Sequence, residues 1–591
     1  MKFDPAEVFG AVAFREAAGA LSRPLVVFQM VFLALIAAGK FAGPASPFPD
    51  VYWMFSDPTL FVDDLVLNDS AIVKGTAFFA LIHALGIKLE LSVHALAFHM
   101  VFSLVSVVFC VRILLRHFAI PTIETSLAIV IVASFLTNEF FRSTDASVLW
   151  SSSANPYFLA HALTFPFLYF LLADRFLPAA GFLFAALFIS LPETFLLVAM
   201  TGVYVLLHPG ARRRSALFLL LPAAYLVYRL LNSHVPPMST AQAVDLTREI
   251  IGFSSFHDIL YVRQGWESAT ILIATFLAFP FVVRKLEAPS VRVFAWAAWI
   301  CSVVIFSAQI AYTQYLYEYF PSPFFLYLFL SNPLNLYSLF FALAALAIAF
   351  RIPSLGWHEK LAVCMFFVLL HGDFRSLLIA AVFPILFIVL PRIVQRIAGA
   401  GFGKAGAISR VSNWMETFRP PMVVTLVLFA YFVVRIPTSF SGFNLDVPSF
   451  RHLGFWTNSE FFSEGTWQSY KALATIPENF PLVAVYRPYQ RIGADYKMPS
   501  TFLNIVARKT RVVPYEEHAL FNVDVLRMIG MRAKIFKKTI DSINARQEIS
   551  SDAVEFLRTS GIRVMVPAAV ADLFPRPASK RQFDEMILIE Y

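Results

Sequence analysis

Long apolar runs recur along the first 437 residues of this chain, and they restrict its fold more than any other feature of the sequence. About thirteen of these runs are long enough, or nearly long enough, to cross a bilayer as helices. The runs cover residues 24–42, 91–113, 123–138, 155–172, 177–191, 193–208, 215–232, 268–283, 292–312, 334–350, 358–372, 375–391 and 421–437. This pattern predicts a polytopic α-helical membrane protein, in which the fifth, sixth and eleventh helices are short.

The composition excludes a soluble protein of this length. Of the 591 residues, 58% are hydrophobic and only 15% are charged, and the mean hydropathy is +0.68. A water-soluble surface needs more charge than this. The three cysteines lie inside apolar runs, where the sequence supplies no further ligands. We therefore expect neither a disulfide nor a metal site from them.

The segment at 71–87 decides the orientation of every later run. It either spans the membrane or lies on its surface as an amphipathic helix, and its apolar residues recur on one helical face, which favours the surface. With a cytoplasmic N-terminus, this choice makes the basic loops cytoplasmic and most acidic loops external, as the positive-inside rule requires. The first outer loop is then 43–90, in a protein of the plasma (inner) membrane. The residues expected on the cytoplasmic side are Arg112, Arg116, Arg212, Arg213, Arg214, Arg284, Lys285, Arg292, Arg351, Lys360 and the basic stretch 392–419.

Residues 438–591 differ in character from the rest of the chain, because they hold 19 of its 47 Lys and Arg residues. Helix-like and strand-like segments alternate here, which predicts a soluble α/β domain on the extracytoplasmic side. The expected elements are helices at 459–473 and 551–560 and strands at 482–486, 562–566 and 586–590. The spacing of Asp552 and Glu555 predicts a capping box at the second helix.

Two adjacent carboxylates, Asp63 and Asp64, lie in the first outer loop within the sequence MFSDPTLFVDDLVLND. The apolar residues on both sides favour a packed loop over the alternative, a solvated acidic loop. A positioned carboxylate can take the proton from an attacking hydroxyl, and Asp64 is slightly favoured over Asp63 for this role. If a divalent cation takes part, these two residues are its expected ligands.

With this topology and this acidic pair, the chain resembles the membrane-embedded C superfamily of glycosyltransferases, which have the GT-C fold. The resemblance rests on the cytoplasmic N-terminus, on Asp63-Asp64, on the surface helix before the second span and on the outer α/β domain. It implies transfer of a sugar from a polyprenyl-phosphate donor to a glycan, lipid or protein acceptor on the outer face. Inversion at the anomeric carbon is expected, because a single base promotes direct displacement.

Such a donor releases an anion, which needs cations and hydrogen-bond donors to stabilise it. Arg375, in the sequence HGDFR, is the first choice for this role, followed by Arg142 and Arg263, because few other cations lie at outer span ends. The alternative for each arginine is a structural pair with a nearby acid or a lipid headgroup. Further residues are expected to line the same cleft: Asp50, Glu193, Tyr315, Tyr317, Tyr319 and His371.

Two of these cleft predictions have plain alternatives. Glu193, in the sequence SLPETF, is equally well explained as a residue that ends a helix in a turn. The tyrosines between 312 and 337 suit an interfacial belt as well as a cap whose rings stack on a sugar or pack on an isoprenoid chain.

Two other classes of protein share the expected helix count: a flippase or transporter for a lipid-linked sugar, and a non-catalytic assembly protein. Transporters commonly show internal repeats and ionisable residues deep in their spans. Here no repeat is apparent and the charges collect near helix ends. The sequence therefore favours the enzyme, with the donor, the acceptor and membrane lipids as partners and no nucleic acid.

Overall fold

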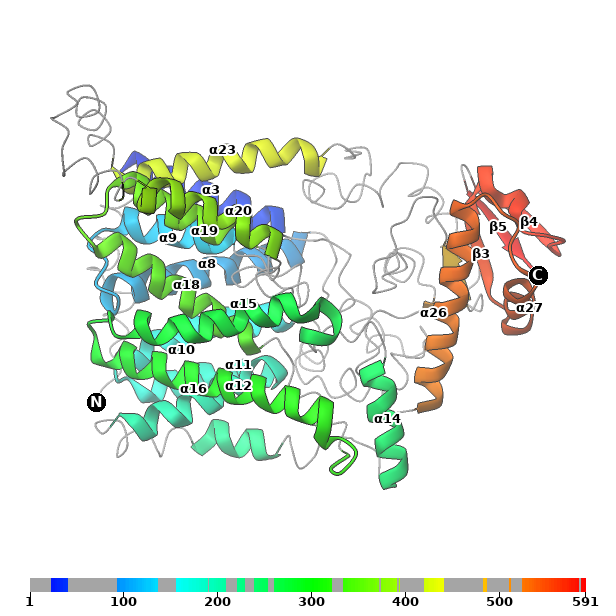
Figure 1. The fold of residues 1–591 in the computed structure, drawn as a ribbon, viewed down its shortest axis with the longest axis horizontal. Coiled ribbons are helices and arrows are strands. Elements are labelled where there is room, and N and C mark those ends of the chain that lie inside the picture. The colour runs from blue at the N-terminus through cyan, green and yellow to red at the C-terminus, as the bar shows by residue number, and fades with distance from the viewer. Residues whose placement is uncertain are drawn as a thin grey trace.

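The computed structural model describes residues 23–40, 93–135, 156–189, 191–208, 220–228, 239–252, 260–321, 333–370, 374–390, 393, 419–440, 482–485, 510–511, 523–583 and 586–591. Most of these residues are helical, and a small sheet lies near the C-terminus. Figure 1 shows a bundle of roughly aligned helices on one side and the sheet on the other.

Each predicted apolar run coincides with a helix in the described part of the chain. The helices of the bundle are α3 Pro24–Lys40, α8 Val93–Arg116, α9 Ile123–Phe135, α10 Pro156–Leu172, α11 Phe176–Ile189, α12 Leu191–Leu207, α15 Leu260–Val283, α16 Pro289–Ala311, α18 Pro333–Arg351, α19 Trp357–Leu369, α20 Phe374–Pro384 and α23 Pro420–Phe440. Residues 220–228 are also helical. A π-helical turn continues α16 over Tyr312–Leu316, and a second continues α20 over Ile385–Val389.

The helices differ in length and in apolar character. Within the residues that the structure describes, one continuous helix, Pro289–Leu316, is long and apolar enough by itself to cross a membrane. Nine other apolar helical stretches are shorter, between 10 and 17 residues. The observed architecture is therefore a mostly helical protein with a small C-terminal sheet.

Helix α9 forms the centre of one half of the bundle. Its residues are buried on every side from Thr125 to Ser134, and it contacts α3, α8, α18, α19 and α23. Gln29 links α3 to α9 and α23 in this half of the bundle. Its Nε2 donates to the Glu124 carbonyl of α9 at 3.0 Å and to Thr425 Oγ1 of α23 at 2.9 Å. A helix that is apolar all round is stable only when other helices surround it, as they do here.

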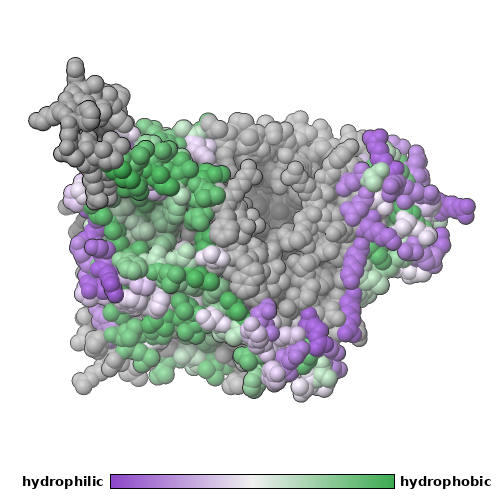
Figure 2. Space-filling model, viewed as in Figure 1, coloured by the Kyte–Doolittle hydropathy of each residue, from purple (hydrophilic) through white to green (hydrophobic). Residues whose placement is uncertain are grey.

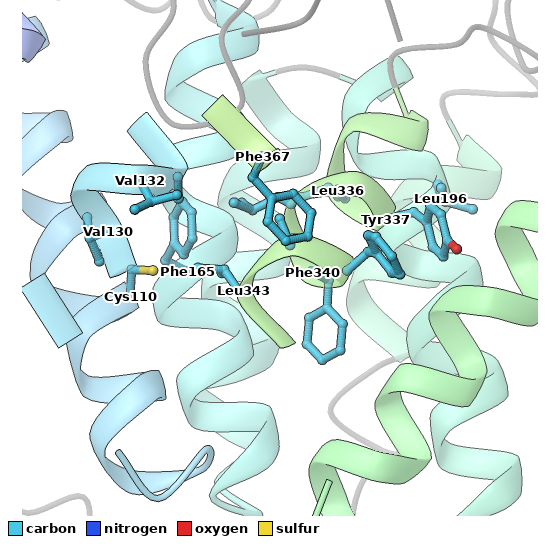
Figure 3. Packing of buried hydrophobic residues seen from close by; sticks show 14 of the residues in the cluster. Cys110, Val130, Val132, Phe165, Leu196, Leu336, Tyr337, Phe340, Leu343 and Phe367 are labelled. Atoms are coloured by element: carbon cyan, nitrogen blue, oxygen red, sulfur yellow. The ribbon is translucent and has the colours of Figure 1, made fainter. Parts of the chain in front are cut away.

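Aromatic rings fill the space between α15 and α18. Phe279 is completely buried, and its ring lies 5.2 Å from Tyr337 and 5.6 Å from Phe341, edge to face in both pairs. In Figure 3 the side chains of α18 lie between Cys110 of α8 and Leu196 of α12. Edge-to-face pairs add to the dispersion energy that holds such helices together.

Basic helix ends gather at one end of the bundle. Arg23 pairs with Glu124 at 2.7 Å, and Arg116 donates from Nη1 to Tyr169 Oη at 3.1 Å. Arg351 at the end of α18 forms an ion pair with Glu287 in the α15–α16 turn. The turns α8–α9, α15–α16 and α18–α19 all lie at the left of the bundle in Figure 1, on the side away from the sheet. We call this side the basic end.

His117, in the turn after α8, is expected to make the stability pH-dependent. Its pKa is lowered from 6.5 to about 4, mainly by burial and also by neighbouring Arg116, while a hydrogen bond to the backbone of Tyr169 acts in the opposite direction. Between pH 6.5 and pH 4, His117 binds a proton in the unfolded chain but not in the folded chain. Stability therefore falls as the pH drops from 6.5 toward 4. Lowering the pH from about 7 to about 5 should cost about 2 kcal/mol.

Thermal unfolding of the wild type and His117→Gln at both pH values checks this expectation. The variant should lose most of the extra sensitivity of the wild type to acid. An equal fall in Tm for both proteins would show that His117 is not responsible.

The C-terminal sheet has five strands in the order β2-β1-β3-β5-β4. Strand β1 pairs in parallel with β2 and β3, while β5 pairs antiparallel with both β3 and β4. The elements are β1 Leu482–Val485, β2 Thr510–Arg511, α26 Val523–Asn544, α27 Ser551–Ser560, β3 Arg563–Pro567, a 3₁₀ turn at Ala568–Leu573, β4 Ser579–Phe583 and β5 Met586–Glu590. The predicted helix at 551–560 and the strands near 482, 562 and 586 are thus confirmed, while the predicted helix at 459–473 lies outside the described residues.

The predicted capping box at α27 is wrong. Ser550 is the N-cap of α27, and it makes no side-chain capping bond. Asp552 instead contacts Lys538 of α26 at 3.2 Å, and Glu555 pairs with Arg558 one turn later at 2.8 Å. The two acids therefore serve ion pairs on the helix surface, where side-chain spacing of three or four residues favours such contacts.

Candidate functional site

The structure describes the predicted site residues to different extents. Five of them, Asp50, Asp63, Asp64, Arg142 and His371, lie outside the described residues. Three more, Glu193, Arg263 and Arg375, lie on described helices. At these positions the structure describes the backbone alone. Tyr315, Tyr317 and Tyr319 are described with their side chains.

Glu193, Arg263 and Arg375 occupy equivalent places in the bundle. Each lies in the first turn of its helix: α12, α15 and α20, respectively. Helix α15 ends at the basic end, so it begins at the other end. Helix α19 begins at the basic end, so α20, which follows it, begins at the other end as well. In α12 it is the late residue Tyr204 that contacts Phe294, which lies early in α16 and therefore near the basic end. All three first turns therefore lie at the end of the bundle opposite the basic end. Glu193 is inside a helix and not in the turn that was the alternative for it.

The C-terminal end of α16 reaches this same opposite end and carries the three tyrosines. Tyr312 is buried, and its Oη donates to the Phe320 carbonyl at 3.2 Å. This bond holds the chain beyond the π-helical turn in a tight curve. Tyr315 and Tyr319 are 70% and 77% exposed. Single π-helical turns are frequently found at functional sites, because they shift the side chains that follow them.

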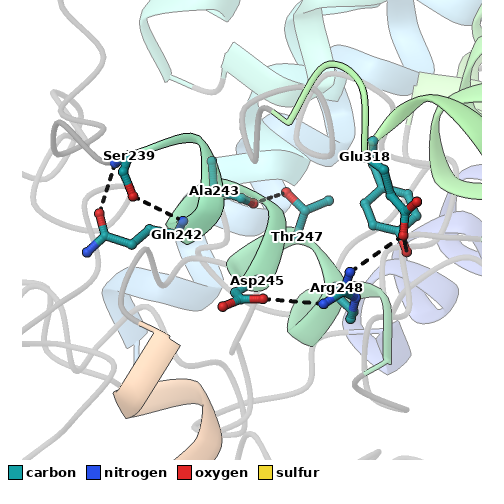
Figure 4. A network of polar contacts seen from close by, with 8 residues as sticks. Ser239, Gln242, Ala243, Asp245, Thr247, Arg248 and Glu318 are labelled. Atoms are coloured by element: carbon teal, nitrogen blue, oxygen red, sulfur yellow. Dashed lines mark hydrogen bonds and ion pairs between the residues drawn. The ribbon is translucent and has the colours of Figure 1, made fainter.

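Helix α14, Thr240–Gly252, contacts the residues that follow this turn through Arg248 and Glu318. It begins with a reciprocal cap, in which the Ser239 backbone N–H donates to Gln242 Oε1 at 2.9 Å and the Gln242 backbone N–H donates to Ser239 Oγ at 3.3 Å. Arg248 then bridges Asp245 at 3.3 Å and Glu318 at 3.5 Å, as Figure 4 shows. This contact between Arg248 and Glu318 therefore links α14 to the end of α16.

Hydrogen bonding and charge keep Arg248 protonated. A hydrogen bond with Tyr317 is the main cause that raises the pKa of its guanidinium, and Glu318 and Asp245 contribute in the same direction. Tyr317 in turn lies 3.3 Å from Glu318 through its Oη. Exposed ion pairs of this kind contribute little to stability.

Arg248 and Glu318 were not predicted as site residues. The signal in the sequence is the amphipathic pattern of 240–252 between two apolar runs, with Asp245 and Arg248 three residues apart on its polar face. The partner Glu318 is distant in sequence and could be identified only from the structure.

Two features of the described residues bear on ligand binding. Among them, no group of three His, Cys, Asp or Glu side chains is placed to hold a metal ion. A cavity of about 30 Å³ lies inside the bundle, lined by apolar side chains such as Leu197, Phe294 and Phe340 together with Thr164. It has room for roughly two water-sized groups.

Rings, a carboxylate and a guanidinium thus meet at the opposite end of the bundle. Exposed tyrosine rings can stack on the apolar face of a sugar, and the charged groups can bond its hydroxyls. No protein-family model matches the chain, and comparisons with curated proteins and with solved structures gave no significant match either.

Proposed function

We propose that this chain is a membrane-embedded glycosyltransferase that transfers a sugar from a polyprenyl-phosphate donor to an acceptor on the outer face of the plasma membrane. The apolar surface of the bundle supports the membrane setting (Figure 2). Leu277, Phe281 and Leu378 are 69%, 69% and 70% exposed. Large apolar side chains exposed over aligned helices fit contact with lipid better than contact with water. In this proposal the shorter apolar helices also cross the membrane, as a GT-C-like module.

The distribution of charge supports the orientation. The basic end suits the cytoplasmic side, by the positive-inside rule. The aromatic turn at the opposite end then faces outward, and the C-terminal sheet, which lies beyond that end in Figure 1, is extracytoplasmic. In the same orientation the first turns that hold Glu193, Arg263 and Arg375 are also outside.

The observation that carries the catalytic proposal is this shared outer end: an exposed aromatic turn, tied to an amphipathic helix, lies at the same end of the bundle as the three helix starts. The acceptor hydroxyl attacks the anomeric carbon and loses its proton to a carboxylate. The bond from that carbon to the phosphate oxygen breaks, and its electron pair leaves with the polyprenyl phosphate. We assign the base to Asp64 or Asp63. Arg375, Arg142 and Arg263 are the candidates for holding the phosphate.

Tyr315 and Tyr319 are assigned to the sugar. Replacing both by Ala is expected to raise the KM for the donor roughly tenfold or more, because ring stacking of about 0.5–1.5 kcal/mol per residue is lost. Stability should be unchanged, since both rings are exposed. The test measures sugar transfer and thermal unfolding of the purified variants in parallel.

Tyr312→Phe is the matched control, because it removes one hydroxyl from the same turn. Its bond to the Phe320 carbonyl is worth about 1 kcal/mol, so Tm should fall slightly. A normal KM for the Tyr315/Tyr319 double variant would remove the aromatic turn from the proposed site.

A further inference from the structure

Helix α26 presents a cationic row on one face. Arg527, Lys534 and Lys538 are exposed, and so is Met531 between them. Their spacings of four, three and four residues place all four side chains on one side of an α-helix. Arg532, Thr539 and Ile543 on other faces are buried. The helix is therefore held by one side while the row remains accessible.

Positive charge is concentrated in this part of the C-terminal region. Residues 523–546 contain six Lys and Arg residues and two Asp residues. Figure 2 shows a hydrophilic band along α26. Lys538 also contacts Asp552 at 3.2 Å, which fixes α27 beside the row. A row of cations along one side of a helix complements a linear polyanion better than a single small anion.

The position of α26 connects the row to the aromatic turn. Helix α26 packs against α14, and Arg248 of α14 contacts Glu318 at the end of α16. In Figure 1 both α14 and α26 run across the direction of the bundle helices, with α14 closer to the bundle. A ligand on α26 would thus lie next to the helix that touches the turn.

A lipid surface fits this row less well than a soluble polyanion. A helix that lies in a membrane interface exposes a broad apolar face, whereas among the described side chains of α26 the exposed large apolar one is Met531. In Figure 1, α14 also lies on the bundle side of the lower end of α26.

We propose that the cationic row of α26 binds an anionic glycan and presents it as the acceptor. This inference rests on the proposed glycosyltransferase function, because that function supplies the reason for a glycan beside the aromatic turn. The acceptor is then a polysaccharide that carries carboxylate or phosphate groups.

The test compares two triple variants of the full-length protein in detergent. One is Arg527→Gln/Lys534→Gln/Lys538→Gln, which removes the row. The other is Arg576→Gln/Lys580→Gln/Arg581→Gln, which removes three exposed cations near β4, including Lys580, which pairs with Asp572 at 3.1 Å as Lys538 pairs with Asp552. Both change the net charge equally. The probes are polygalacturonate, neutral dextran and phosphatidylglycerol vesicles.

The wild type and the β4 triple should bind polygalacturonate alike, with an affinity that falls as salt rises. The α26 triple should bind it roughly tenfold more weakly or worse, with a flatter salt dependence. Equal losses in the two triples, no binding to polygalacturonate, or stronger binding to vesicles than to polygalacturonate would each overturn the proposal. Because binding needs no turnover, this result is independent of the glycosyltransferase assay.

Discussion

Replacing Asp64 by Asn is expected to lower the rate of sugar transfer by about 10²–10⁴-fold, the usual contribution of a general base. The amide keeps the shape of the carboxylate but cannot take the proton of the acceptor hydroxyl. Asp63→Asn should have a smaller effect if Asp63 orients the base, and the larger effect if the roles are reversed. The measurement is sugar transfer from a polyprenyl-phosphate donor by purified protein in liposomes.

Asp69→Asn provides the matched control, since it makes the same chemical change in the same predicted loop outside the acidic pair. It should leave transfer nearly unchanged. Equal Tm values for the three variants would exclude misfolding as the cause of any loss. Full activity in both Asp63→Asn and Asp64→Asn would refute the proposed base.

Phe279→Ala is expected to give the largest loss of stability, about 3–5 kcal/mol. The Phe279 ring is completely buried between α15 and α18, and its loss removes edge-to-face contacts with Tyr337 and Phe341. In the proposed membrane setting such packing is the main force between the helices, because lipid is as apolar as the helix surface. Thermal unfolding in a fixed detergent measures the effect.

Phe281→Ala tests whether burial is the cause. Phe281 lies two residues away on the same helix and is 69% exposed, so its removal opens no internal cavity. Among the described residues, its ring has a distant contact with the Arg284 guanidinium, at 6.0 Å. We expect a small change in Tm. A Phe281→Ala loss as large as that of Phe279→Ala would contradict the assigned packing.

The helices of the bundle were predictable because apolar runs report burial or lipid contact directly. Helix α9 is the clearest case, since its uninterrupted apolar sequence matches a helix that is buried on every side. The sequence pattern of the C-terminal region likewise located β1, β3 and β5. Such strands are apolar because they lie in the interior of the sheet.

Elements with mixed composition were not predictable in the same way. Strand β4, with the sequence SKRQF, lies at the sheet edge, where charged residues are favoured and the usual strand pattern is absent. Helix α26 combines a cationic row with a narrow buried face, so it does not stand out as an apolar run. The Arg248–Glu318 pair joins residues 70 positions apart, and only the packing of α14 brings them together.

The fate of a labelled donor tests the proposed glycosyltransferase function most directly. Polyprenyl-phosphate carrying a radioactive sugar is placed in liposomes that contain the purified protein and an anionic glycan acceptor. A glycosyltransferase should place labelled sugar on the acceptor while an equal amount of free polyprenyl phosphate is released. Movement of the intact donor across the bilayer, with its sugar–phosphate bond unbroken, would contradict a glycosyltransferase and indicate a flippase.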